Sequence, residues 1–328
     1  MGSKPRGISA SRGAAVLGLS EYQTPFEVWQ RIMEERQPGF NAAHGYAMPP
    51  EPDSAAMRWG TVFESAVIEL AEQAQGKNII HRERYDEAPR MEYVTCHLDG
   101  VYSGTDALIH EGKTTSAMTY REKWGQPGTD HIPRSYQVQV QHQMMCTGAD
   151  ECIVSVLVFP EIPDKWEQMG IVIENESMLI NGNSLRPMRW ARILAEMGYF
   201  HQYHIRANPE VQKHLVSAYS KFWQDNVLTG KPPEPRNYDD IKRLCPEPVG
   251  TIVCDTQMTA WILEYNAIAK ELSKTGNAAK RQEKLKLRIL NQARKMNPVM
   301  DDESQEKVIF RDTAGNKLKQ YSAKGGFR

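Results

Sequence analysis

Four side chains between positions 64 and 113 have the types and spacing that metal-assisted hydrolysis requires. Glu111 and Lys113 stand two residues apart in a segment that alternates in polarity like a β-strand, so both side chains leave the same strand face. Asp99 ends the preceding predicted strand, before a turn around residues 100–105. Glu64 belongs to a predicted helix. Acids that converge from a helix and two strands can gather around a hard divalent cation, which prefers oxygen ligands.

These residue types predict phosphodiester hydrolysis with two metal ions. One ion would polarise a phosphate and lower the pKa of a bound water, and the second would stabilise the leaving oxygen. A charged lysine cannot ligate magnesium, but Lys113 could hold or deprotonate the attacking water and add positive charge. The backbone carbonyl of Gly112 could supply a further hard oxygen ligand.

A helix predicted for Ala55 to Gln75 must position Glu64. Val67, Gly60 and Ala71 lie three, four and seven residues from Glu64, which places this carboxylate on an apolar stripe. A buried carboxylate without a partner is costly, so Glu64 in that position would need a cation or an arginine. The alternative is that Glu64 lies at the edge of the stripe, in contact with water.

A second, glutamine-rich helix is predicted for Ser135 to Cys146. Val140 and Met144 belong to its core stripe, and Gln137 and Gln141 lie on the neighbouring stripe. Glutamines in that position could hydrogen-bond a phosphate, a water or a base edge. The alternative is an ordinary amphipathic helix with a polar flank.

The first residues of the chain combine small hydroxyl side chains with basic ones. Ser9 or Ser11 is predicted to cap a helix that begins there. A helix N-terminus with hydroxyls and the nearby Lys4, Arg6 and Arg12 offers a site for an anion. The commoner explanation of such a segment is a capped surface helix that follows a loose basic tail.

Strand and helix patterns follow one another along the chain and predict an α/β fold, with a central mixed sheet flanked by helices. Glu151 to Phe159 is a nearly continuous apolar run, which is typical of a buried strand. Asn208 and Pro209 open a strong helix, which is predicted to stop at Gly230, and the proline-rich stretch Pro232 to Pro235 prevents its continuation.

We therefore divide the chain into a domain at 1–235 and a C-terminal extension at 236–328. Residues 241–255 suggest a linker, because prolines interrupt the apolar residues. A β-hairpin is predicted within residues 308–321. Residues 270–295 contain nine Lys or Arg and two Glu in a helix-prone segment, which suits a nucleic-acid backbone or a solvated helix face.

Composition excludes several classes of protein. The 328 residues have a formal net charge of −1, and no apolar run approaches the roughly 20 residues of a membrane span. The N-terminus has no apolar signal core, so we expect a cytoplasmic protein. The five cysteines form no Cys-x-x-Cys pair, which argues against a zinc ribbon or an iron–sulfur site and fits reduced thiols. A balanced charge still permits a nucleic-acid partner if the basic groove is local.

A helix acid, an Asp-Gly pair, a Glu-x-Lys tripeptide and a glutamine-rich helix follow one another in this chain. Their order resembles the PD-(D/E)xK nuclease superfamily and, within it, the lambda-exonuclease-like (YqaJ-type) viral recombination nucleases. The resemblance implies a restriction-endonuclease-like core. The matching segments are Ile8 to Ser11, Arg58 to Glu64, His97 to Gly100, Glu111 to Lys113 and Gln139 to Met144.

The resemblance assigns a role to each matching residue. Glu64, Asp99 and Glu111 become metal ligands, Lys113 becomes the water-activating lysine, and Gln141 lies near the water. The family grips a terminal 5′-phosphate with a hydroxyl and an N-terminal arginine. In this chain the hydroxyl matches Ser11, and the place of the arginine falls near Lys4, with Arg6 and Arg12 close by.

The resemblance also implies an activity and its partners. We expect a magnesium-dependent 5′→3′ exonuclease of double-stranded DNA ends, encoded by a phage or prophage and acting in the bacterial cytoplasm. It would release 5′-mononucleotides and leave 3′ single strands for a single-strand annealing protein. Manganese would substitute for magnesium, and the ring-shaped homotrimer of the family would thread the DNA.

Three alternatives stay open. The first is an endonuclease built on the same core, which would cut circular DNA. The second is a Cas4-like or helicase-linked nuclease, although such proteins usually carry a four-cysteine cluster that this chain lacks. The third is a non-catalytic DNA-binding or assembly protein with a vestigial core, for which an intact set of acids and a lysine would be unnecessary.

Overall fold

The structure is a computed structural model of the full chain. It describes residues 7–50, 54–80, 84–161, 163–168, 171–174, 177–180, 183–244, 250–271, 276–296, 307–322 and 326–327. These residues form two compact units, one of residues 1–22 and 50–225 and the other of residues 23–49 and 226–328. No helix in the described part of the chain is long and apolar enough to cross a membrane. The predicted division after Pro235 stays a prediction.

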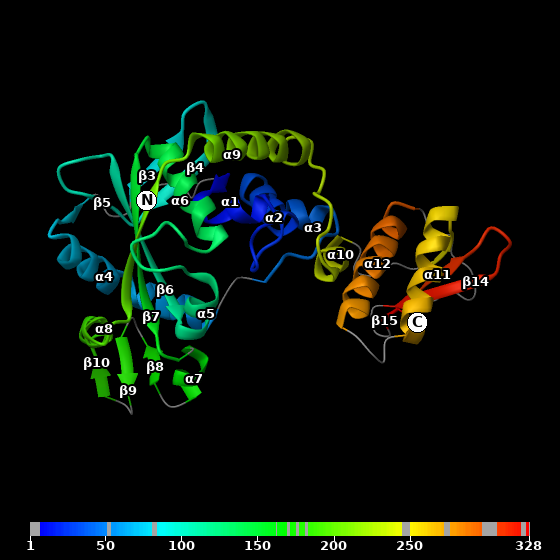
Figure 1. The fold of residues 1–328 in the computed structure, drawn as a ribbon. Helices are drawn as coiled ribbons and strands as arrows, with labels where there is room; N and C mark the ends of the chain where they lie inside the picture. Colours follow the sequence, from blue (N-terminus) through cyan, green and yellow to red (C-terminus); the bar gives the residue numbers. More distant parts are fainter. Residues whose placement is uncertain are drawn as a thin grey trace. The chain divides into compact units, whose positions relative to one another are not determined.

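A five-stranded mixed sheet forms the centre of the first unit (Figure 1). Strands β6 and β7 run parallel, with Glu111 opposite Val154, and the other neighbours are antiparallel. The predicted α/β fold with a mixed sheet is therefore confirmed. In spatial order the strands are β11 (Phe200–Arg206), β7 (Glu151–Phe159), β6 (Leu108–Ser116), β5 (Gly100–Tyr102) and β2 (Ile79–Ile80).

A second sheet has three strands, and Asp99 connects it to the first sheet. Its central strand β4 (Met91–Leu98) pairs parallel with β1 (Ile8–Ser9) and antiparallel with β3 (Arg84–Ala88). Only Asp99 separates the end of β4 from the start of β5. The chain thus leaves one sheet and enters the other at this residue. A third, antiparallel sheet consists of β8 (Ile171–Glu174), β9 (Ser177–Ile180) and β10 (Asn183–Leu185).

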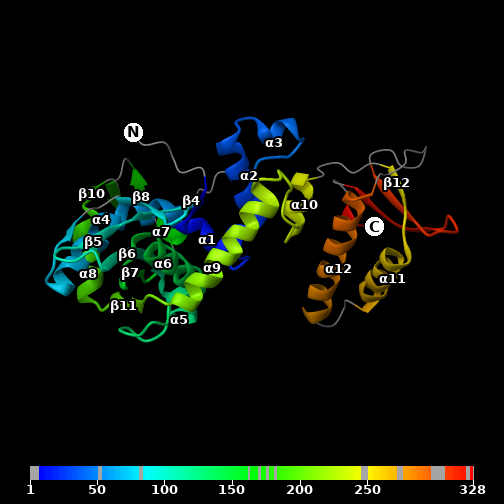
Figure 2. The same cartoon turned by 90° about the horizontal axis from the view of Figure 1, so that it is seen from above.

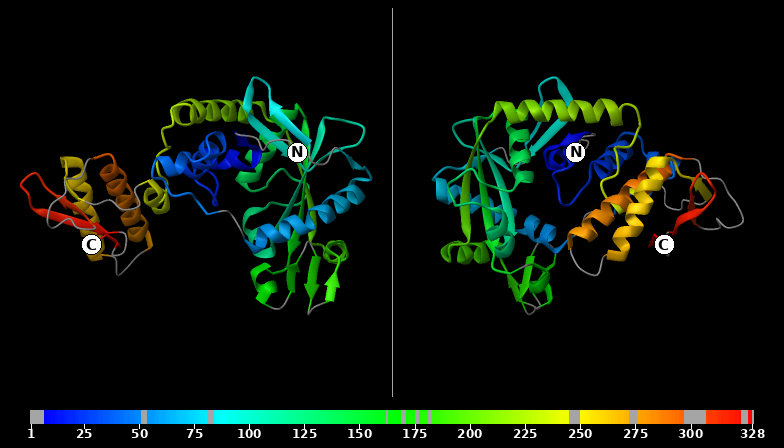
Figure 3. Two further views of the ribbon diagram at one scale, coloured as in Figure 1. Left: turned by 180° about the vertical axis from the view of Figure 1, so that it is seen from behind. Right: turned by 45° about the vertical axis from the view of Figure 1, so that its right-hand side comes forward.

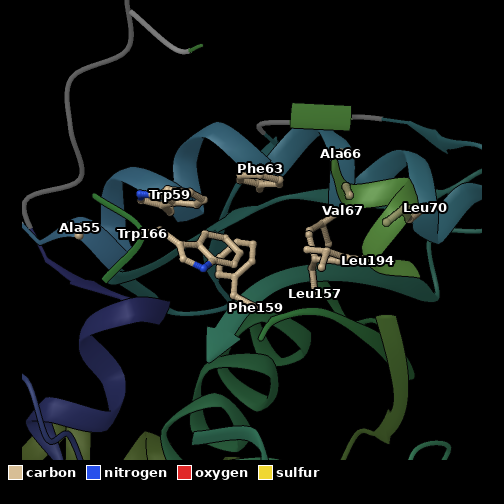
Figure 4. Close-up of a cluster of buried hydrophobic side chains, with 11 residues drawn as sticks. Ala55, Trp59, Phe63, Ala66, Val67, Leu70, Leu157, Phe159, Trp166 and Leu194 are labelled. Carbon is tan, nitrogen blue, oxygen red and sulfur yellow. The ribbon is translucent and has the colours of Figure 1, made fainter. Parts of the chain in front are cut away.

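Helix α4 (Ala55–Gln75) has the predicted bounds and crosses the central sheet, as the left panel of Figure 3 shows. Its first turn is capped by Ser54, which accepts a hydrogen bond from the N–H of Met57. Trp59 and Phe63 are fully buried and meet Phe159 of β7 (Figure 4). Aromatic rings bury large apolar areas, so this cluster fixes the helix on the sheet. Helices α7 (Pro163–Gln168) and α8 (Pro187–Glu196) lie beside this cluster.

Helix α6 (Arg134–Thr147) packs with α1 (Ala10–Val16) and α9 (Pro209–Phe222), and Figure 2 shows α9 along the same region. The two partner helices approach α6 closely. A Cβ at Gly13 would stand 2.2 Å from the Tyr219 hydroxyl, so α1 requires glycine there. A π-helical turn, Trp223–Val227, follows α9. One short helix, α5 (Ala117–Lys123), follows β6, and Ser116 caps it.

The second unit contains a four-stranded sheet and a helical hairpin. Strand β12 lies inside residues 241–255, which were predicted to form an irregular linker. That prediction is therefore wrong. The strand pairs parallel with β13, with Gly250 opposite Val308, a contact between distant parts of the chain that local patterns do not show. The predicted C-terminal hairpin is confirmed. The elements are α2 (Pro25–Arg36), α3 (Phe40–Ala43), α10 (Tyr238–Leu244), β12 (Gly250–Val253), α11 (Thr256–Glu271), α12 (Gly276–Arg294), β13 (Val308–Arg311), β14 (Lys317–Ser322) and β15 (Gly326–Phe327).

Candidate active site

Glu111 of β6 is the centre of a buried polar cluster. It is 1% exposed, and its carboxylate accepts hydrogen bonds from three side chains. Lys113 donates to Oε1 from the same strand face, as the two-residue spacing predicts. Gln139 donates to Oε1 at 2.6 Å and Gln143 donates to Oε2 at 2.5 Å, both from α6. A buried charge is stable only when it is paired and hydrogen-bonded, and Glu111 meets both conditions.

Asp99 lies beside this cluster, at the junction of β4 and β5. Its Oδ2 accepts a hydrogen bond from the N–H of Gly112 at 2.7 Å, which ties the carboxylate to the edge of β6. Burial and the charge of Glu111 raise the pKa of Asp99 to about 7, although Lys113 and the Gly112 N–H act in the opposite direction. The charged form of Asp99 is therefore disfavoured in this position, by burial first and by the neighbouring Glu111 second.

Lys113 carries the positive charge of the cluster. Burial acts to lower its pKa, but the charges of Glu111, Tyr136 and Asp99 and the hydrogen bond to Glu111 together outweigh burial, so the pKa of Lys113 is raised. The ammonium nitrogen lies 4.9 Å from the centre of the Tyr136 ring, within the range of a cation–π contact. Lys113 is thus an ammonium ion held in one place, suited to orienting a water or a phosphate oxygen.

The pair Asp99 and Glu111 has the donor chemistry of a magnesium site. Magnesium is usually bound by one or two carboxylates, with waters and substrate phosphates completing the shell. A divalent cation would also remove the repulsion that raises the pKa of Asp99. The N–H and C=O of one strand residue point to the same neighbour, so the carbonyl of Gly112 faces the strand edge that Asp99 occupies.

Glu64 does not complete a three-carboxylate cluster with this pair. Its charge contributes to the raised pKa of Asp99, so it lies in the neighbourhood. However, it is exposed, and among the residues that the structure describes no group of three Asp, Glu, His or Cys is arranged to hold a metal. The alternative in which Glu64 lies at the edge of the apolar stripe is the one that the structure adopts.

The pleat of β6 explains why Glu64 stays apart. Glu111 and Lys113 face α6, as their glutamine contacts show. Gly112 faces α4, because a Cβ there would lie 3.3 Å from Val67. Helix α4 therefore covers the opposite face of the strand from the buried carboxylate, and Glu64 reaches the site only from its rim.

Gln141 does not face the carboxylates. Its amide nitrogen donates to the carbonyl of Arg206 at 2.7 Å, and its oxygen accepts from the N–H of Asn208 at 2.8 Å. It therefore holds the connection between β11 and α9. The glutamines at the site are Gln139 and Gln143, which the sequence analysis did not select. Their four-residue spacing was the available signal, but Gln137 and Gln141 have the same spacing.

The predicted phosphate-binding residues lie at the start of the described chain. Ser9 precedes α1 as its N-cap residue, and its hydroxyl lies 3.1 Å from that of the exposed Ser11 rather than on the helix N–H groups. Arg12 donates to the carbonyl of Gly7 at 3.1 Å. Lys4 and Arg6 lie outside the described residues. The hydroxyls are thus close together, and nothing in their contacts tests the phosphate assignment.

Comparison with solved structures finds two exonucleases with low sequence identity to this chain. LHK-Exo, an alkaline exonuclease from Laribacter hongkongensis whose structure in complex with dAMP is known, is 17% identical, with a TM-score of 0.46. That alignment covers 69% of this chain and 90% of LHK-Exo. A phage related exonuclease from Haemophilus somnus 129PT is 14% identical with a TM-score of 0.40, over 68% of this chain and 96% of its own.

Sequence relatives point to one family. The uncharacterized protein YqaJ of Bacillus subtilis (strain 168) is 26% identical over 228 residues, which are 70% of this chain and 56% of the relative. This chain thus matches little more than half of that protein. The model of the YqaJ-like viral recombinase domain matches residues 2–150, the segment that contains Asp99, Glu111 and the glutamine helix. Residues 2–150, slightly less than half of this chain, are therefore similar to the YqaJ-like viral recombinase domain.

Proposed function

We propose that this protein is a magnesium-dependent nuclease that degrades double-stranded DNA from its 5′ ends. Phosphodiester hydrolysis would release 5′-mononucleotides and leave 3′ single strands for phage-type recombination. The observation that carries this proposal is the buried Glu111, gripped by Lys113, Gln139 and Gln143 next to an Asp99 of raised pKa. A protein that only bound DNA would have no use for a buried Glu111 beside a partly buried Asp99, because both carboxylates oppose its phosphates.

The chain's own residues support the chemistry in distinct ways. Asp99 and Glu111 would hold magnesium, which when bound polarises the phosphate and acidifies a water. Lys113 presents its ammonium Nζ next to these carboxylates, where it orients the water and stabilises charge that develops on the phosphate. Gln139 and Gln143 fix the rotamer of Glu111, so that its oxygens need no reorganisation during the reaction.

Selectivity for the DNA end is assigned to the first described residues. Ser11 is exposed and close to Ser9 at the start of α1, which suits a hydroxyl clamp for a terminal 5′-phosphate. Arg12, with Lys4 and Arg6 before it, would supply positive charge. A homotrimer around the DNA, a partner protein that anneals single strands and use of manganese in place of magnesium complete the proposal by family resemblance.

The test is digestion of linear duplex DNA with 5′-phosphate or 5′-hydroxyl ends beside a closed circle, in magnesium and then in manganese. Loss of the 5′-phosphorylated linear strand alone, with release of 5′-mononucleotides, is expected. The Lys113→Ala variant should leave all substrates intact. Nicking of the circle would replace the exonuclease by an endonuclease, and absence of cleavage by the unmodified protein in both metals would refute the enzyme.

A further inference from the structure

We propose that helix α12 of the second unit contains a separate binding surface for the phosphate backbone of DNA, formed by Lys280, Lys284 and Arg288. These three residues follow one another at intervals of four, so they lie on one face of the helix, about 6 Å apart along its axis. All three are exposed. The inference rests on the proposed function in one respect, that DNA is the polymer this protein meets.

The opposite side of α12 explains why this face is turned outward. Ile289, Leu290 and Ala293 are buried in the core of the second unit, together with residues of α11 and the four-stranded sheet, and Leu285 is buried as well. Burial of these apolar side chains fixes the rotation of the helix. The face with the three basic residues therefore points away from the unit's own core, toward solvent.

The other basic residues on α12 or just after it have acidic or aromatic partners in the same unit. Arg281 donates to Glu264 at 2.7 Å, and Lys295, just after the helix, donates to Glu234 at 2.8 Å. Lys286 lies 4.1 Å from the centre of the Tyr238 ring. Within the part of the chain that the structure describes, Lys280, Lys284 and Arg288 have no such ion pair.

The spacing of these three basic residues distinguishes them from an ordinary solvated helix face. Like charges at intervals of four along a helix repel one another, so a helix without a partner gains nothing from three of them in a row. The whole chain has a net charge of −1, so this cluster does not simply follow from a basic composition. Three unneutralised cations at regular spacing complement a regular array of phosphates, which lie along each DNA strand.

The partner is DNA backbone rather than base edges. Lysine ammonium groups and an arginine on an exposed face contact phosphates without reading sequence. Such contacts would add affinity that depends on salt and not on sequence, the property that an enzyme needs while it advances along its substrate. The surface thus assigns to the second unit the task of retaining DNA, separate from the hydrolytic centre of the first.

The experiment uses the full-length protein and a fluorescein-labelled DNA duplex in EDTA, so that no hydrolysis takes place. Anisotropy titrations at several salt concentrations between about 50 and 200 mM give the slope of log K against log salt. The triple variant Lys280→Gln, Lys284→Gln, Arg288→Gln should reduce the slope by up to about 2.7 and weaken binding at least about tenfold. Glutamine preserves helix propensity.

A matched control removes the same total charge from paired residues. The variant Arg281→Gln, Lys286→Gln, Lys295→Gln should retain most of the affinity and of the slope, and circular dichroism melting checks that both variants are folded. Equal losses in the two variants would overturn the assignment to this face, because net charge alone would explain them. Unchanged binding in both would also overturn it, and would leave this face to a different partner such as an acidic protein.

Failure of this inference is distinguishable from failure of the proposed nuclease. The binding titration contains no divalent metal and measures no cleavage. An inactive protein that loses DNA affinity only in the Lys280, Lys284 and Arg288 variant would support the surface while refuting the enzyme. An active protein whose DNA binding is unaltered in that variant would support the nuclease and refute the binding surface.

Discussion

The candidate active site around Glu111 and the α12 surface use similar charged residues in opposite environments. Glu111 and Lys113 are withdrawn from water and hold one another through a network that includes two glutamines. Lys280 and Arg288 extend into solvent without partners among the described residues. Chemistry on a phosphate requires fixed charges in a low-dielectric site, whereas retention of a long polyanion requires only accessible charge. Substitutions should therefore have large effects on activity in the first region and small, salt-dependent effects in the second.

The largest expected effect is at Lys113. Lys113→Ala should reduce the rate of nucleotide release by about a thousandfold or more, because it removes a preorganised charge at the reacting phosphate. DNA binding in EDTA should change little, since the substitution removes a single cation that is only partly exposed and is paired with Glu111. The rate is measured by acid-soluble nucleotide release from linear duplex DNA. Retention of more than about a tenth of the activity would remove Lys113 from the reaction.

A buried histidine gives a prediction on stability as a function of pH. His142 of α6 is fully buried, with its ring nitrogens 3.1 Å from the Tyr219 hydroxyl and 2.9 Å from the carbonyl of Thr95. Burial lowers its pKa to about 4, although the Thr95 carbonyl opposes this shift. Between about pH 6.5 and 4 the unfolded chain binds a proton that the folded chain does not, so stability falls as the pH falls.

The size of the shift sets the expected loss from His142, at most about 3 kcal/mol of unfolding free energy across this window. Urea unfolding at pH 7 and pH 4.5, compared with the His142→Gln variant, isolates this contribution from that of the carboxylates. The variant is expected to be less stable at pH 7 but to lose less on acidification. Parallel losses in the two proteins would show that His142 is protonated in the folded state.

Long, regular sequence patterns made the central sheet and part of the candidate active site predictable. Helix α4 and strand β7 have the predicted bounds, because one has a sustained apolar stripe and the other an uninterrupted apolar run. Glu111 and Lys113 share a face because the period of a strand is two, whatever the rest of the fold does. Asp99 reached the site because it ends one strand just before the next begins.

Sequence patterns could not predict the rotation of α6 about its own axis. Its buried residues include Val138, Val140 and the run from Gln141 to Met144, so apolar and polar residues are buried on several faces. Helix periodicity then gives no preferred face. Two residues of register turn a helix by about 200°, and this rotation decides whether Gln139 and Gln143 or Gln137 and Gln141 meet Glu111. Only the packing against the two sheets and the neighbouring helices makes that choice.

The two glutamine pairs give a direct test of this rotation. Gln143→Ala removes a donor from a buried carboxylate and should lower the catalytic rate about tenfold or more. Gln141→Ala should instead lower stability by about 1–3 kcal/mol, because it leaves the Asn208 N–H without its acceptor, and should alter the rate much less. The rate at saturating DNA measures the effect on catalysis, and urea unfolding measures the effect on stability. Equal rate losses would mean that both glutamines serve the site.

The smallest expected effect comes from a single residue of the α12 surface. Arg288→Gln should reduce the slope of log K against log salt by about 0.9, the contribution of one phosphate contact. Because its side chain is exposed and lacks an ion pair among the described residues, unfolding free energy should change by less than about 0.5 kcal/mol. Arg281→Gln is the matched control, since that arginine is already held by Glu264. A larger slope change for Arg281 than for Arg288 would place the DNA on a different face of the helix.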